Sequence, residues 1–163
     1  MKHLFLLFFL TSANFAVSQN YFYLEEIKLK KKDDFVDHQK NIIIAIDYMT
    51  GSAIDEKDMD RKACMRFIIR YAEKTTQTIT IGSDVAKISD KNPDFLVLYM
   101  GLWLKSNFNN KTGTDDNHKK YAFTEIYKYI KRGNNVTSTD EIKSFLKAGD
   151  ENKIDDWIKE NNK

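Results

Sequence analysis

The sequence predicts an all-α protein, in which one compact domain of five to seven helices is built around a central hydrophobic helix. Apolar side chains recur at three- and four-residue spacings through most of the chain, which is the period of one helix face. Short segments rich in glycine, asparagine and threonine separate these stretches. The stretch from 93 to 108 is apolar on nearly every side, so we expect the other helices to surround it.

The N-terminus has the pattern of a cleavable signal peptide over residues 1–18. A basic start at 1–3 precedes an apolar run at 4–10, and the small residues at 16–18 suit a signal peptidase. The apolar run is well short of the roughly 18 to 20 residues that cross a bilayer as a helix. We therefore expect an exported chain, periplasmic or secreted, whose single domain at 19–163 keeps no transmembrane anchor.

Two amphipathic helices are predicted in the first half of that domain. The first runs from Asp33 to Met49, and Gly51 is expected to end it in the left-handed conformation. The second begins near residue 55 or 57 and ends near Lys74. Its period places Met59, Ala63, Cys64, Phe67, Ile68 and Tyr71 inside, and Arg61, Lys62, Arg66, Arg70 and Glu73 in solvent. Cys64 is the only cysteine, so the chain forms no internal disulfide.

The middle of the chain is predicted to pass from an extended connector to the central helix. Thr75 to Ile81 alternates β-branched residues without an obvious strand partner, and we expect Ile79 and Ile81 to anchor it over the helices. Ser83 should cap one or two helical turns. Asn92 should cap the helix at 93–108, where a mid-helix Gly101 indicates close contact with a neighbouring helix.

Three more helices are predicted in the C-terminal part. The first spans 118–132 and ends at Gly133. Ser138 with Glu141 forms a capping box before the second, which Gly149 ends. Asp150 is expected to cap the last, which Ile154, Trp157 and Ile158 fasten to the core.

The charge balance argues against nucleic acid as a partner. The formal net charge is +2 at pH 7, so the overall attraction to polyanions is weak. A lysine cluster at 28–32 lies between acidic residues, which is typical of a solvated segment.

Metal and cofactor chemistry find little support in the sequence. The acidic stretch 55–60 lacks the glycine and terminal glutamate of a calcium loop, and 150–152 fails in the same way. Asp115, Asp116 and His118 have donor atoms for a metal, but the surrounding pattern favours a helix cap with a partly exposed histidine. We assign no catalytic, cofactor-binding or metal-binding residue, and expect no cofactor.

Catalysis is also weakly supported, although two distant carboxylates can meet in a fold and act as acid and base. The chain has no G-x-S-x-G motif, and no histidine has a recognisable serine or cysteine partner. The sequence therefore favours binding over enzymatic activity. The aromatic residues are explained by core packing, with Tyr48 and Tyr127 as candidates for a partner or sugar surface.

Part of the chain resembles a known group of proteins. The residues at 63–68, 76–81 and 92–96, leading to Tyr99 and Gly101, resemble a group of small exported bacterial helical proteins without an assigned function. The resemblance covers about residues 60–105 and implies an envelope or secreted location and a helical fold, without an active site.

Asn110-Lys111-Thr112 and Asn135-Val136-Thr137 would be glycosylation sites in a eukaryotic host.

Three functions are consistent with this sequence. The first is a protein-interaction or binding module in the periplasm or outside the cell, such as an inhibitor or immunity-type protein, whose partner is another envelope or secreted protein. The second is a small-molecule-binding or hydrolytic protein with a cleft between helices. The third is a structural envelope component. The oligomeric state is open.

Overall fold

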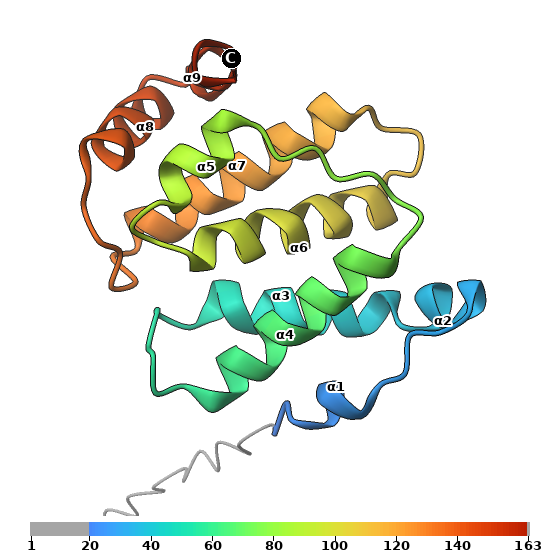
Figure 1. Cartoon of the computed structure of the whole chain (residues 1–163). Coiled ribbons are helices and arrows are strands. Elements are labelled where there is room, and N and C mark those ends of the chain that lie inside the picture. Colours follow the sequence, from blue (N-terminus) through green and yellow to red (C-terminus); the bar gives the residue numbers. More distant parts are fainter. Residues whose placement is uncertain (1–19, 163) are drawn as a thin grey trace, which may run out of the picture.

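The computed structural model describes residues 20–162, which fold into one compact all-α domain (Figure 1). The predicted signal peptide at 1–18 lies outside the described residues. Within 20–162 there are nine helices and no strand. They are α1 (Tyr23–Glu26), α2 (Lys32–Asp37), α3 (Gln39–Gly51), α4 (Met59–Lys74), α5 (Ser83–Ser89), α6 (Asp94–Asn109), α7 (Asp115–Lys131), α8 (Asp140–Asp150) and α9 (Ile154–Asn161). The predicted all-α class is confirmed.

The predicted number of five to seven helices is too low for the described residues, for two reasons. The stretch predicted as one helix from Asp33 to Met49 divides at His38, which ends α2 and begins α3 with φ −102° and ψ 9°. Beside the break, the Phe35 carbonyl accepts a hydrogen bond from the Tyr71 hydroxyl of α4 (2.6 Å). This tertiary contact leaves no mark on the local pattern. The single-turn α1 is the other addition.

The hydrophobic helix α6 is the centre of the fold, as predicted. It packs against α3 and α4 on one side and against α5 and α7 on the other (Figure 1). Gly101 permits the close approach to α3 and α4, because a Cβ there would lie 2.9 Å from Ile46 Cδ1 and 3.2 Å from Ile68 Cδ1. A methyl group at those distances would force its neighbours to shift, so the predicted close contact is confirmed.

Two predicted helix starts are wrong, and Gly51 ends its helix as predicted but not in the predicted left-handed conformation. Asn92 does not cap α6, because its side-chain amide donates to the Thr137 carbonyl (2.9 Å) and its oxygen accepts from the Thr137 amide (2.8 Å). Gly51 is the last residue of α3 and has no positive φ; Gly133 does, at 88°. Ser83 is the first residue of α5 and not its N-cap. The N-cap position is occupied by Gly82, which has no side chain to cap the helix.

The caps of the last two helices also differ from the prediction. Thr139, not Ser138, caps α8 by accepting from the Ile142 amide (3.2 Å). Asp150 is the last residue of α8, and the chain then turns through Asn152, whose φ is 57°. The predicted anchoring of α9 is confirmed, since Trp157 is buried and its neighbours pack against the core.

The buried and exposed faces of α4 follow the prediction with two exceptions. Cys64 is buried as expected, and burial raises the pKa of its thiol to about 12. Met59, predicted inside, is 50% exposed, whereas Arg61, predicted in solvent, is 1% exposed. The connector after α4 is extended, and Ile79 packs against the core as expected. The prediction that Ile81 also anchors the connector is wrong, because its side chain is 49% exposed.

Candidate functional site

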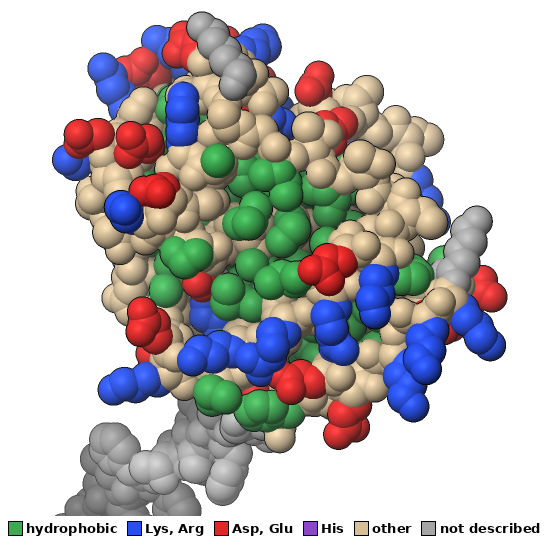
Figure 2. All heavy atoms as spheres, viewed as in Figure 1, with side chains coloured by type: hydrophobic (Ala, Val, Ile, Leu, Met, Phe, Trp, Pro, Cys, Tyr) green, Lys and Arg blue, Asp and Glu red, His purple; other side chains and the backbone are tan. Residues whose placement is uncertain are grey.

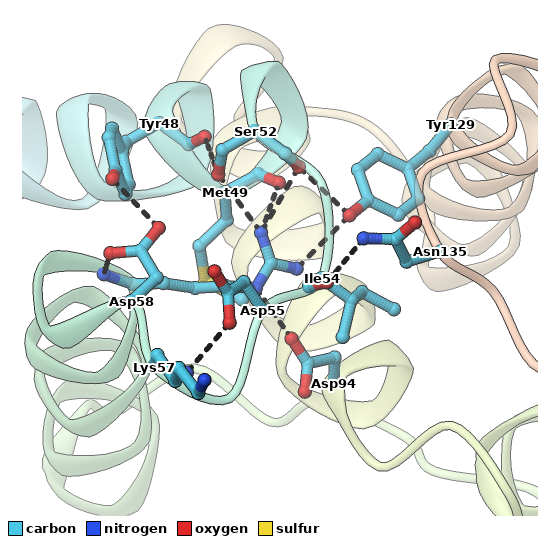
Figure 3. Close-up of polar contacts among 11 residues, drawn as sticks. Tyr48, Met49, Ser52, Ile54, Asp55, Lys57, Asp58, Asp94, Tyr129 and Asn135 are labelled. Atoms are coloured by element: carbon cyan, nitrogen blue, oxygen red, sulfur yellow. Dashed lines mark hydrogen bonds and ion pairs between the residues drawn. The ribbon is translucent and has the colours of Figure 1, made fainter.

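A buried polar cluster is centred on Arg61, and Figure 3 labels its partners Met49, Ser52, Asp94 and Tyr129. The Arg61 Nε donates to Asp94 Oδ2 at 2.6 Å. One terminal nitrogen donates to the Met49 carbonyl at 2.8 Å, and the other to the Tyr129 hydroxyl at 3.3 Å. The Tyr129 hydroxyl donates in turn to the Ser52 carbonyl at 2.9 Å. One guanidinium thus links the end of α3 to α4, α6 and α7.

The Arg61 cluster acts as a structural tie. Its acceptors include the Met49 and Ser52 carbonyls at the end of α3, which have no partner inside that helix. The guanidinium is buried among these groups, so it has no surface from which to bind a ligand. A sequence signal for its burial exists, since Arg61 shares a helix face with Cys64 and Ile68 at the i+3 and i+7 positions.

A second buried ion pair joins α5 to α7, and no sequence pattern predicted it. Lys119 Nζ lies 2.7 Å from Asp84 Oδ2, and both side chains are at most 3% exposed. The other carboxylate oxygen of Asp84 accepts from the Val85 amide (2.9 Å). Apart from each other, Lys119 Nζ and Asp84 Oδ2 have no polar partner within 20–162.

The residues considered for a metal do not form one site. His118 is buried rather than partly exposed, and its Nδ1 lies 2.9 Å from Ser106 Oγ. The Trp103 ring packs against the imidazole, and the Trp103 indole donates to Asp115 (2.7 Å). Asp116 is exposed, and Thr114 caps α7. His118 is therefore part of the aromatic core. The residues around it in the sequence, which resemble a helix cap, do not indicate this burial.

The acidic stretches have structural partners too. Asp58 caps α4 by accepting from the Arg61 amide (2.9 Å) and also accepts from the Tyr48 hydroxyl (2.8 Å). Asp150 accepts from Tyr127 (2.7 Å), and hydrogen bonds from that hydroxyl and from Lys131 lower the pKa of its carboxyl. Over residues 20–162, no three His, Cys, Asp or Glu side chains are grouped so that they could hold a metal ion. The hydroxyls of Tyr48 and Tyr127, proposed for a partner or sugar surface, are bound to these carboxylates.

A surface-accessible apolar groove lies between α4 and α6. Figure 2 shows a continuous field of hydrophobic side chains over this region. The apolar groove is defined by Ile69 and Ala72 of α4, Ile79 and Ile81 of the connector, and Leu96, Val97 and Met100 of α6, with Glu73 at its edge. It encloses about 360 Å³, and Ile81 is 49% exposed on its wall. Exposed apolar residues that gather in a hollow mark interaction sites more often than isolated ones do.

A row of cationic side chains runs along α4 beside the groove. Figure 2 shows lysine and arginine side chains along one border of the hydrophobic field. We define the basic stripe as Lys62, Arg66, Arg70 and Lys74. Successive members are four residues apart, so the stripe rises about 6 Å at each step and turns about 40° around the helix, with Arg66 and Arg70 nearest the groove. A hollow of about 440 Å³ lined by Glu25, Arg66, Ile69, Arg70 and Glu73 joins the stripe to the groove.

Two arginines of the stripe also hold α1 in place. Arg66 Nε donates to Glu25 Oε1 at 2.8 Å. Arg70 donates to the Leu24 carbonyl at 2.7 Å and to the Glu25 carbonyl at 3.1 Å, at the end of α1. Lys62, Arg70 and Lys74 form no ion pair with any carboxylate of the described residues. The four cations of the stripe face two carboxylates in the adjoining hollow, Glu25 and Glu73, so a surplus of positive charge remains beside the groove.

Comparisons with protein-family models, with curated proteins and with solved structures find no match to this chain. The resemblance of residues 60–105 to small exported bacterial proteins therefore stays a prediction. None of the helices within 20–162 combines the length and the apolar character needed to cross a membrane.

Proposed function

We propose that this protein is a protein-interaction module that binds its partner in the apolar groove, as an inhibitor or immunity-type protein that occupies a surface of that partner. The observation that carries the proposal is the groove itself, where side chains of α4, α6 and the connector form an apolar hollow open to solvent. Covering a fully exposed aliphatic side chain contributes roughly 1.5 to 3 kcal/mol, and covering a half-exposed one such as Ile81 contributes proportionally less. Because several such side chains line the groove, a partner that covers it gains from all of them together.

The expected location narrows the class of partner. With the signal peptide predicted at 1–18, we propose that the partner is another envelope or secreted protein. The basic stripe beside the groove favours a partner that is acidic where it meets α4, because complementary charge speeds association and excludes partners of the wrong sign.

The test is capture of the partner by three purified forms of the protein. These are the unmodified protein, the groove variant Ile81→Asp and the matched control Val36→Asp. Ile81 and Val36 are both exposed aliphatic residues, at 49% and 63%, but Val36 lies on α2 outside the groove. The envelope and secreted fractions of the producing cell are applied to each form, and retained proteins are quantified by mass spectrometry.

We expect one protein to be retained by the unmodified form and by Val36→Asp, and its affinity for Ile81→Asp to be at least about tenfold lower, equivalent to about 1.4 kcal/mol. Circular dichroism of the three forms should coincide. Equal retention by all three forms, or no retention by any, contradicts the proposal.

A further inference from the structure

We infer that the occupant of the apolar groove is an amphipathic helix of the partner that carries carboxylates along the edge facing the basic stripe. This inference rests on the proposed function and adds the chemistry of the bound segment. It is carried by the walls of the groove and by the spacing and pairing of the four cations.

The walls of the groove favour a helical occupant. Two of the three walls are helices, α4 and α6, whose backbone groups are bonded within each helix, so they present side chains to a ligand. A segment bound between them must satisfy its own main-chain hydrogen bonds as it leaves water, and a helix does so internally. Apolar side chains at i, i+3, i+4 and i+7 of such a helix would fill the hollow.

The basic stripe specifies the charge of that helix. Lys62 and Lys74 are exposed and have no carboxylate partner among residues 20–162. The hydrogen bonds of Arg70 go to carbonyl groups, and Arg66 pairs with Glu25. A bound helix with Asp or Glu at four-residue intervals repeats every 6 Å or so, as the stripe does. Aligned along α4, its carboxylates would meet successive cations while its apolar face enters the groove.

An anionic membrane surface also combines apolar and acidic groups, but the shape of the site disfavours it. Proteins that bind at a membrane interface insert protruding apolar side chains into it. Here Ile69, Ala72, Leu96 and Met100 are only partly exposed and line a hollow. A convex segment such as a helix reaches them, whereas a flat lipid surface does not.

The experiment is selection from a displayed library of helical peptides. The library carries a fixed apolar stripe, and the positions flanking that stripe are randomised. Selection is run against the unmodified protein, the groove variant Ile81→Asp, the stripe variant Lys62→Glu/Lys74→Glu and the charge-matched control Lys40→Glu/Lys147→Glu. Lys40 and Lys147 are exposed, form no ion pair among the described residues and lie outside the groove.

We expect the peptides selected by the unmodified protein to carry Asp or Glu at four-residue intervals on one flank. Synthetic peptides of this consensus should bind the unmodified protein and the lysine control alike, and the stripe variant at least tenfold more weakly. They should also bind less tightly as salt is raised, and not bind Ile81→Asp.

The outcomes separate the two proposals. Groove-dependent peptides without an acidic flank overturn the inference about charge and leave the proposed function standing. A natural partner that depends on Ile81, with no helical peptide selected, overturns the helical occupant alone. Binding of the unmodified protein and the lysine control to vesicles of anionic phospholipid, lost in Ile81→Asp, overturns the inference in favour of a membrane surface.

Discussion

Arg61 of α4 and Asp94 of α6 form an ion pair of 2.6 Å in which the arginine side chain is 2% exposed and the aspartate side chain 14%. Their contact joins the first turns of the two helices that form the walls of the apolar groove. The same guanidinium also bonds the end of α3 and the Tyr129 hydroxyl. The geometry of the groove therefore depends on this buried cation.

Replacing Arg61 by methionine is expected to lower the free energy of unfolding by about 3 to 5 kcal/mol, because it leaves Asp94 and the α3 carbonyls without their donor. Urea unfolding measures the change. Arg66→Met is the matched control: its ion pair with Glu25 is half exposed, so it should cost less than about 1 kcal/mol. Similar losses in both variants would contradict the assigned role of Arg61.

The buried pair of Lys119 and Asp84 should behave as a unit. We expect Lys119→Met to cost about 3 to 5 kcal/mol, since it leaves the Asp84 carboxylate buried without its cation. The double variant Asp84→Asn/Lys119→Met should regain a substantial part of that loss, since it buries no net charge. Thermal unfolding of the wild type, the two single variants and the double variant measures this coupling. Additive losses would show that the two groups do not interact.

Gly149 and Gly51 offer an opposed pair of substitutions to alanine. A Cβ at Gly149 would lie 2.3 Å from two ring carbons of Tyr127, whereas a Cβ at Gly51 meets nothing within 4 Å. We expect Gly149→Ala to destabilise by about 1 to 3 kcal/mol because the ring must move. Gly51→Ala should be neutral or stabilising by up to about 1 kcal/mol, because it restricts the unfolded chain. The denaturant midpoints of the two variants measure these changes. A Gly51→Ala variant less stable than Gly149→Ala would contradict the described packing.

Much of the fold is predictable from the sequence because apolar residues recur with the helical period in α3, α4, α7 and α8, and because α6 is apolar on nearly every side. The buried polar residues that connect the helices are not predictable in this way. Arg61 has the same side chain as the exposed Arg66, and its burial depends on acceptors from distant segments, which include the Asp94 carboxylate and the Met49 carbonyl. In the same way, Asn92 does not cap α6 because its side chain is hydrogen-bonded to the backbone of Thr137. Local spacing places Arg61 on the buried face of α4, but it does not reveal the distant partners of such side chains.

The groove could not be predicted from the pattern of any single segment either. Ile69, Ile79 and Leu96 each look like ordinary core residues in their own segment. They become a surface only because α4, the connector and α6 come together with no other element of residues 20–162 lining the hollow. The predicted absence of catalytic, cofactor and metal residues stays a prediction.

Cys64 should be nearly inert in the native protein. Burial raises the pKa of its thiol to about 12 from an ordinary value of 9.0, which makes the reactive thiolate about a thousandfold rarer at pH 8, since each pKa unit is tenfold. A colorimetric thiol reagent should therefore label the native protein at least a hundredfold more slowly than the urea-unfolded protein. Equal rates would contradict the burial of this residue.

The same shift has a defined consequence for alkaline stability. The folded state holds the Cys64 proton more tightly than the unfolded state does, so the unfolded chain ionises first. The free energy of unfolding should fall as the pH rises from 9 towards 12, and Cys64→Ala should fall less steeply over that range. Below pH 9 the two slopes should agree.

Site-specific photo-crosslinking tests the central claim, that the apolar groove is a protein-binding surface, most directly. A photoreactive phenylalanine analogue replaces Ile81 in one form of the protein and Val36 in another, and each is irradiated in the presence of the envelope and secreted proteins of the producing cell. We predict one strong adduct from position 81, mapped by mass spectrometry to a single segment of one partner, and none of that partner from position 36. Adducts from position 36 alone, or the same adducts from both positions, would contradict the claim.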